Sequence, residues 1–191
     1  SMYPFGVDLA VRMRVPGVAD VLEGRHRPGH FDGVCTVVAR LFNQVQPDVA
    51  AFGKKDFQQL AVIQQMVTDL AYPLALLRGD IVREDDGLAM SSRNQYLSPA
   101  ERVTACEIHK TLLQMRDALL AGTPRADVEA QGARRLADAG FVVDYAAVRT
   151  PDLAEPDAAP AQYASPGPRV ALVAARLGRT RLIDNLEFTV A

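Results

Sequence analysis

Two segments in the first half of the chain carry apolar residues at helical spacing. Between residues 31 and 45, and again between residues 56 and 70, these residues gather on one face. Short apolar runs at 48–52 and 73–82 follow the two helices and are typical of strands, and the first of them is expected to be buried. Helices and strands that alternate with short links predict βαβ units and a doubly wound parallel sheet.

The first 30 residues show weaker patterns. Residues 11–15 alternate apolar and polar positions, as a strand does. Residues 18–24 predict a short helical turn that ends at Gly24. The basic stretch 25–30 contains a proline followed by a glycine, which predicts an irregular loop.

A helix start at Ser98 opens a different pattern. This residue is suited to an N-cap, a proline follows it at the first helical position, and Glu101 lies in the first turn. We therefore predict a helix from there to about Ala121, and a second helix over residues 127–139 that ends at Gly140.

Three apolar runs near the end of the chain predict strands at 141–148, 169–175 and 180–185. The turn residues 178–180 join the last two runs closely, so these two strands should pair antiparallel. Residues 151–168 are rich in proline, alanine and aspartate and predict a loop.

The change of pattern near Val82 divides the chain into two predicted domains. Residues 1–81 give the Rossmann-like, doubly wound parallel sheet of an α/β protein. Residues 82–191 give a smaller α+β domain with a short antiparallel sheet. A sheet of the first kind binds ligands beyond the carboxyl ends of its strands.

Composition narrows the functional classes. The 191 residues carry a formal net charge of −2, which argues against a surface that coats nucleic acid. No apolar run is long enough to span a membrane, and the first residues lack the basic and apolar regions of a signal peptide. Cys35 and Cys106 fall in apolar helical patterns and are expected to be buried thiols rather than a disulfide or a metal pair. These features indicate a cytoplasmic protein.

The first candidate site follows the first strand and consists of Gly53, Lys54, Lys55 and Asp56. Gly53 allows a tight turn and close approach to a ligand. Lys55 can reach phosphate oxygens where a helix N-terminus adds positive potential. Asp56 suits ribose hydroxyls or a magnesium-bound water, and Gln59, one turn further, can bind a polar substrate. A solvated helix start with exposed lysines is the alternative.

The second candidate site is the polar segment formed by Met90, Ser91, Ser92 and Arg93. Its hydroxyls and guanidinium suit a mobile loop that closes over polyphosphate and stabilises charge on the α-phosphate and the departing pyrophosphate. A linker before a helix start is the alternative. Together the two segments offer the cations, hydroxyls and backbone N–H groups that hold a nucleoside triphosphate.

The histidines are not assigned to a metal. His26 and His30 stand four residues apart, but Pro28 and Gly29 between them break any helix. A basic loop that binds a substrate carboxylate or phosphate through Arg27 and His30 is the favoured interpretation.

Other polar positions receive no chemical role. His109 lies in a predicted helix and is expected at the surface or in packing. The pairs Asp144-Tyr145 and Asp184-Asn185 look like residues of strand edges and turns.

Five ordered blocks of the chain resemble the pantothenate synthetase (pantoate–β-alanine ligase) family of the class I nucleotidyltransferase-like superfamily. The blocks cover residues 27–34, 52–60, 81–84, 87–94 and 182–185. Their order and spacing match the family along essentially the whole chain. The resemblance implies that ATP, with magnesium, activates pantoate as pantoyl adenylate and releases pyrophosphate. β-Alanine then attacks the adenylate, which gives pantothenate and AMP.

The resemblance also assigns roles to residues by their position. The ATP site that it implies contains Gly53, Lys54, Lys55, Asp56, the backbone of Val82, and the loop residues Met90, Ser91, Ser92 and Arg93. Among these, the catalytic residues are Lys55, Ser91, Ser92 and Arg93, which act by positioning and electrostatics without a covalent protein nucleophile. Gln59 would hold pantoate. Its pocket would be lined by Val34, Val37 and Val38, although helix packing alone also explains these three valines.

One part of the family pattern has no counterpart in this sequence. The segment with the first βα unit, the HxGH-type histidines and a glutamine that binds both substrates is missing, so the Rossmann-like domain is expected to be partial. Because those histidines should stabilise the transition state, we expect the chain alone to be inactive or nearly so. An exposed sheet edge or apolar surface is expected where the missing strands would pack. The resemblance further suggests a homodimer.

Two other interpretations stay open. The chain is compatible with a folded non-catalytic module that binds nucleotide or dimerises through its exposed sheet, and ATP binding without turnover would support that description. It is also compatible with a different acid-activating adenylyltransferase, which would form AMP with another acid better than with pantoate.

Overall fold

The computed structural model describes residues 2–8, 10–156 and 165–191. It divides into two compact units, residues 1–79 and residues 80–191, whereas the sequence pattern places the domain boundary between residues 81 and 82. The loop predicted over 151–168 lies partly outside the described residues. Of its described part, 151–156 contain no helix or strand, and the last two residues already belong to a strand.

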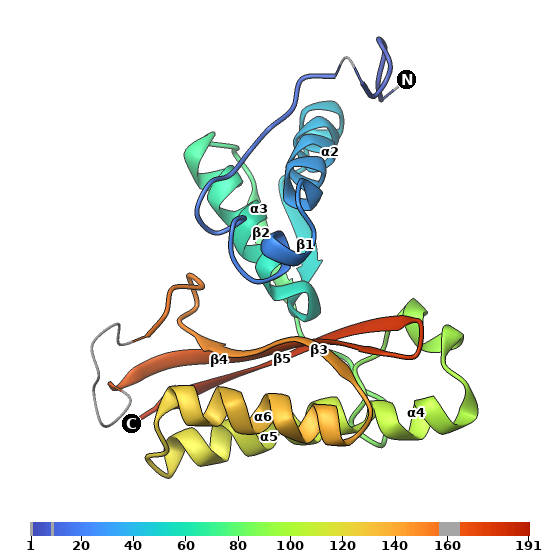
Figure 1. Cartoon of the computed structure of the whole chain (residues 1–191). Helices are drawn as coiled ribbons and strands as arrows, with labels where there is room; N and C mark the ends of the chain where they lie inside the picture. The colour runs from blue at the N-terminus through green and yellow to red at the C-terminus, as the bar shows by residue number, and fades with distance from the viewer. Residues whose placement is uncertain (1, 9, 157–164) are drawn as a thin grey trace. The chain divides into compact units, whose positions relative to one another are not determined.

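Helices and strands alternate in the first unit, which runs from blue to blue-green in Figure 1. In chain order its elements are α1 Glu23–His26, α2 His30–Val45, β1 Val49–Gly53, the 3-10 turn η1 Lys54–Asp56, α3 Phe57–Asp69 and β2 Ala75–Gly79. β1 and β2 pair in parallel, with Val49 opposite Ala75 and Gly53 opposite Gly79. The predicted order and the parallel pairing are confirmed, and the two strands end at the same edge of the sheet.

The apolar faces of α2 and α3 form the core of the first unit. Phe31, Cys35 and Phe42 of α2 cluster with Ile63 and Met66 of α3, and all five are buried. Each large apolar side chain buried in this way contributes about 1.5–3 kcal/mol. The helical spacing of apolar residues therefore identified both helices and the faces that they bury.

The strands of the first unit are less buried than predicted. Residues along β1 alternate between exposed and half-buried, and Val49 and Leu77 on the open face are 49% and 57% accessible. Parallel sheets are buried where helices cover both faces, and this face of the sheet stays accessible. The prediction of a buried strand at 48–52 is therefore wrong. Apolar residues of the sheet are accessible, and the packing of further strands of the family fold against this unit stays a prediction.

Two predictions for the first 30 residues are also wrong. Residues 11–15 have no strand partner in the described part of the chain, and the backbone N–H of Met13 instead donates to the Thr36 hydroxyl at 2.9 Å. Helix α1 begins at Glu23, so Gly24 lies inside it and does not end a turn. Glycine is needed there for packing, because an added Cβ would overlap the carbonyl of Ala19.

The second unit, which runs from green to red in Figure 1, consists of helices followed by an antiparallel sheet. Its elements are η2 Ser92–Tyr96, α4 Pro99–Ala105, α5 Glu107–Leu120, α6 Arg125–Asp138, β3 Val142–Arg149, β4 Gly167–Leu177 and β5 Thr180–Val190. The sheet order is β3-β4-β5, and α5 and α6 lie against one of its faces (Figure 1). In this chain it is the longer of the two units, and β4 and β5 have 11 residues each.

The helix predicted from Ser98 to about Ala121 is two helices. Ser98 forms the predicted cap, because its hydroxyl accepts from the Glu101 N–H and the Glu101 carboxylate accepts from the Ser98 N–H. The break falls at Cys106, whose ψ of −19° is typical of a 3-10 turn and interrupts the α-helical hydrogen bonds. Cys106 and Cys35 are both buried free thiols, as predicted.

Candidate functional site

The first candidate site lies at the carboxyl edge of the parallel sheet. Gly53 and Gly79 end β1 and β2 side by side, and the 3-10 turn Lys54–Asp56 follows β1 directly. Helix α3 begins immediately afterwards, at Phe57. The lysines and the aspartate are therefore held between a strand end and a helix N-terminus, where backbone N–H groups and the helix dipole favour anions.

The backbone at Gly53 is extended. Its φ of −75° and ψ of 136° are ordinary extended values, so the 3-10 turn that follows does not require a conformation special to glycine at this residue. The space beside it is open, because an added Cβ would meet no heavy atom within 4 Å. Close approach of a ligand to this backbone stays a prediction.

The three charged residues of the turn differ in exposure. Lys54 and Lys55 are half-buried, whereas Asp56 is exposed. Asp56 occupies the N-cap position of α3, yet its side chain makes no capping hydrogen bond. Its carboxylate is not used to start the helix, which leaves it available for the predicted contact with ribose hydroxyls or a magnesium-bound water.

Two adjacent glutamines on α3 have different environments. Gln58 is buried, and its side-chain amide donates to the carbonyls of Val18 and Val21 at 2.8 Å each, while its carbonyl accepts from the Glu23 N–H at 3.0 Å. This side chain ties the segment before α1 to α3. Gln59 is half-buried and stays the candidate for pantoate. The fixing role of Gln58 was missed, although its position four residues before the buried Val62 could have indicated it.

Arg27 and His30 lie together between α1 and the start of α2. The basic stretch 25–30 is a loop only over residues 27–29, because Arg25 and His26 belong to α1 and His30 is the first residue of α2. An Arg27 guanidinium nitrogen lies 3.0 Å from His30 Nε2 and 3.7 Å from the buried carboxylate of Glu23. Since guanidinium only donates, Nε2 of His30 is the acceptor in this contact.

The three valines expected near pantoate belong to the face of α2 that packs in the core. Val38 is buried in the core cluster, while Val34 and Val37 are partly buried against it. Packing therefore accounts for Val38, and the partly accessible Val34 and Val37 keep surface for a ligand. Contact of these valines with pantoate stays a prediction.

The second unit presents its candidate residues on a short hairpin. The Met90 N–H donates to the Val82 carbonyl at 2.9 Å, and Arg83 and Ala89 form an antiparallel bridge. Ser91 follows as the N-cap of η2, and its hydroxyl accepts from the Arg93 N–H at 3.2 Å. Met90, Ser91, Ser92 and Arg93 are thus brought together by this local structure.

Arg93 lines a cavity of about 490 Å³ at one end of the antiparallel sheet. An Arg93 Nη1 group donates to the Arg181 carbonyl at 3.3 Å, and the Arg181 Nε group donates to Asp144 at 2.6 Å. Three guanidinium groups outnumber the carboxylates of Asp144 and Glu101 beside them, which favours an anionic ligand. The other lining residues are Tyr96 of η2 and Arg179, Thr180 and Arg181 of the β4–β5 hairpin.

Sequence reasoning missed the ion pair between Arg83 and Asp184. The two side chains meet through two hydrogen bonds, Nη1 to Oδ2 at 2.6 Å and Nη2 to Oδ1 at 3.1 Å. Arg83 is 20% exposed and Asp184 only 4%. Asp184 had received no chemical role, and no local pattern connects residues that are so far apart in the chain.

Among the described residues, no three or more His, Cys, Asp or Glu side chains come together in the way a metal site requires. In the same part of the chain, no helix combines the length and apolar character of a membrane span.

The fold and site define the class of the protein. A parallel sheet with helices and a lysine-bearing turn at its carboxyl edge, followed by a three-stranded antiparallel unit, has the α/β, nucleotidyltransferase-like architecture. The sequence profile described as "Pantoate-beta-alanine ligase" matches residues 1–187. The chain belongs to the pantoate–β-alanine ligase family.

Individual relatives agree with this assignment. A pantothenate synthetase of Xanthomonas oryzae pv. oryzae (strain MAFF 311018) is 68% identical over 188 residues, which are 98% of this chain and 65% of that protein. The crystal structure of pantothenate synthetase from Thermus thermophilus matches with a TM-score of 0.85 at 44% identity, over 97% of this chain and 65% of the other. The chain therefore spans less than two thirds of the length of these relatives.

A third relative was solved with ligands. The pantoate-beta-alanine ligase from Francisella tularensis, described as complexed with beta-gamma ATP and beta-alanine, matches with a TM-score of 0.73 at 26% identity. The match covers 97% of this chain and 60% of that one.

Proposed function

We propose that the protein containing this chain catalyses the ATP-dependent condensation of pantoate with β-alanine. The observation that carries the proposal is the family match over residues 1–187. The polar residues of this chain support it, because cations gather at the carboxyl edge of the parallel sheet and at the arginine-lined cavity. The related ligase with bound nucleotide and β-alanine supports ATP and β-alanine as the ligand classes.

The chemistry requires activation, because a carboxylate is a poor electrophile. In the proposed reaction a pantoate carboxylate oxygen attacks the α-phosphorus of ATP, and the bond to the pyrophosphate breaks. The β-alanine amine then attacks the acyl carbon of the adenylate, AMP leaves, and the amine loses a proton. This chain would contribute Lys55 and Arg93 as cations that stabilise the charge that develops on the phosphates, with no covalent step on the protein.

The other candidate residues would contact either ATP or pantoate. Gly53, Lys54, Asp56, the Val82 backbone, Met90, Ser91 and Ser92 would complete the contacts with ATP. Pantoate would be held by Gln59, Arg27 and His30, with the valines of α2 beside it. We propose magnesium as the ion that accompanies the nucleotide polyphosphate, a homodimer as the assembly, and the cytoplasm as the location, the last supported by two buried free thiols.

The test is pyrophosphate release with ATP, magnesium and pantoate before β-alanine is added. In a form of the protein extended to the length of its relatives, Lys55→Ala should lower the rate about a hundredfold or more, because one lost contact to transition-state charge costs about that much. Lys110→Ala, which removes an exposed lysine of α5 in the second unit, is the matched control and should keep the wild-type rate.

Other outcomes separate the alternatives. A better rate with another carboxylic acid would identify a different adenylate-forming enzyme. ATP binding without pyrophosphate release in the extended protein would support a non-catalytic module. The same assay on the 191-residue chain tests the expectation that this chain alone is nearly inactive.

A further inference from the structure

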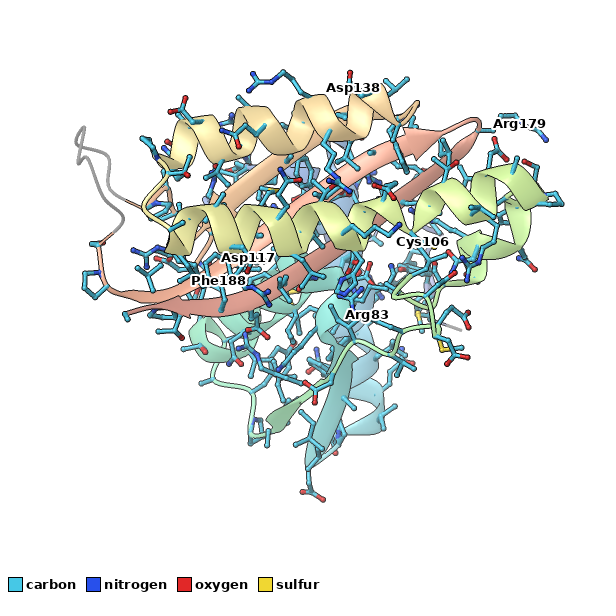
Figure 2. All side chains as sticks on the ribbon, turned by 90° about the horizontal axis from the view of Figure 1, so that it is seen from below. Arg83, Cys106, Asp117, Asp138, Arg179 and Phe188 are labelled. Atoms are coloured by element: carbon cyan, nitrogen blue, oxygen red, sulfur yellow. The ribbon has the colours of Figure 1, made fainter. Side chains whose placement is uncertain are left out.

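The buried ion pair between Arg83 and Asp184 holds the hairpin that leads into the proposed ATP loop. Besides its two bonds to Asp184, Arg83 donates from Nη1 to the Gly87 carbonyl at 3.0 Å and from Nη2 to the Asn185 carbonyl at 3.2 Å. One guanidinium group thus contacts the turn of its own hairpin and two consecutive residues of β5. Figure 2 labels Arg83 in the segment that runs toward one end of α5.

The hairpin 82–90 is otherwise short and local. It has backbone bonds from Glu84 to Leu88 and from Met90 to Val82, both 2.9 Å, and Gly87 lies at its turn with φ +90°. A two-stranded hairpin of this kind is marginal by itself in water. Its position therefore depends on its anchors to the rest of the second unit.

Two weaker contacts accompany the ion pair. Asp86 at the hairpin turn pairs with Arg102 of α4 at 2.6 Å, and the side chains are 46% and 31% exposed. His109 of α5 packs on Gly87, where an added Cβ would lie 2.7 Å from the imidazole Cδ2. The Asp86–Arg102 pair is more exposed than the Arg83–Asp184 pair, and Leu88 of the hairpin is buried in the apolar core of the second unit. The Arg83–Asp184 pair is therefore the main ionic anchor of the hairpin, beside the apolar anchor Leu88.

A buried ion pair is a poor way to gain stability, because the cost of removing two charges from water offsets much of their attraction. What such a pair contributes is a fixed geometry, since the planar guanidinium meets the carboxylate in one orientation only. The position of the pair next to Met90, Ser91, Ser92 and Arg93 suggests what this geometry controls.

We propose that Arg83 and Asp184 are a positioning pair, which fixes the hairpin 82–90 on β5 and thereby places Ser91, Ser92 and Arg93 for the nucleotide. The role in catalysis rests on the proposed function, whereas the fixing of the hairpin does not. Arg83 and Asp184 are not themselves catalytic, because they act through the residues that follow the hairpin.

The first experiment measures amide hydrogen exchange in the 191-residue chain. Arg83→Lys keeps the charge but loses the bidentate geometry, and the amides of Glu84, Gly87 and Met90 should exchange about tenfold faster or more. The matched control is Arg149→Lys, which alters a similarly buried pair with Glu129 at 2.7 Å and 13% and 20% exposure, away from the hairpin. It should leave these three amides unchanged. Equal exchange in wild type and Arg83→Lys would overturn the proposal.

The second experiment measures adenylation kinetics in the protein extended to the length of its relatives. If Arg83 positions groups that act in the transition state, Arg83→Lys should lower kcat about tenfold or more with a smaller change in the KM for ATP. Asp184→Asn should lower kcat in the same way, and Arg149→Lys should not.

Variants that lose thermal stability but keep kcat and KM would show a purely structural pair and overturn the positioning role. If the wild-type protein releases no pyrophosphate, the proposed function fails, and the exchange experiment still decides whether the pair fixes the hairpin.

Discussion

At the scale of single residues, burial decides which of two similar side chains is available for a ligand. Gln58 uses its amide and carbonyl to fix the segment before α1, whereas its neighbour Gln59 is only half-buried. Asp184 is held by Arg83 inside the second unit, whereas Asp56 is exposed at the start of α3. Residue type alone suggests a polar role for all four, and only the surroundings separate fixing residues from binding residues.

His109 gives a prediction at this scale. Burial lowers its pKa from the ordinary value, the nearby Arg83 and Arg116 act in the same direction, and Asp184 opposes them. The folded chain therefore binds this proton less readily than the unfolded chain. As the pH falls below about 6.5, the unfolded state takes up the proton first, so the free energy of unfolding decreases.

Urea denaturation at pH 7.5 and pH 5.5 measures this effect. Wild type should lose more stability between the two values than His109→Gln, which has no imidazole to protonate. The two proteins are compared with each other at each pH, so that the titration of other groups cancels. An identical loss in both proteins would show that the His109 imidazole does not contribute.

At the scale of elements, regular spacing of apolar residues was sufficient to predict helices and strand pairing where these elements pack regularly in the core. The spacing of apolar residues predicted α2 and α3, and the short turn after Leu177 predicted the antiparallel pairing of β4 with β5. The alternation of apolar and polar residues at 11–15 led to a wrong strand prediction, because a strand needs a partner and the described residues offer none. The helix break at Cys106 was missed, since apolar spacing continues through it.

The candidate site was predictable only in part, for a related reason. The segments that hold Lys55 and Arg93 are continuous in sequence, so their motifs could be read directly. The anchors of these segments come from distant elements, such as Asp184 for the hairpin at Arg83 and Asp144 for Arg181. No local pattern indicates contacts of this kind, and the structure is needed to find them.

The start of α4 gives a prediction for an element. Ser98→Ala removes the hydroxyl that accepts from the Glu101 N–H, and loss of such a cap costs about 1 kcal/mol. The free energy of unfolding, from urea denaturation, should fall by about that amount. Ser98→Thr keeps a hydroxyl at the same position and should retain most of the stability. If the alanine and threonine variants are equally stable, the hydroxyl is not the stabilising group.

At the scale of the whole molecule, the two units differ in how completely they bury their own apolar residues. The second unit has a continuous core of residues from α4, α5, α6 and all three strands, including Leu112, Met115, Leu136, Val148 and Val173. Gly132 lets α6 approach α5, because an added Cβ would lie 2.8 Å from the Met115 sulfur. In the first unit, by contrast, two strands keep an accessible apolar face.

This difference predicts that residues 80–191 fold without residues 1–79. A three-stranded sheet covered by two helices meets the usual requirement for independent stability, whereas the two-stranded sheet of the first unit leaves apolar residues accessible. The separate fragment 80–191 should show a far-UV circular dichroism spectrum of mixed helix and strand and a cooperative urea transition. The fragment 1–79 should show a broader transition, because its strands bury less surface. A fragment 80–191 without a cooperative transition would mean that its core does not fold without residues 1–79. The anchors within the second unit would then not be sufficient to position Ser91, Ser92 and Arg93.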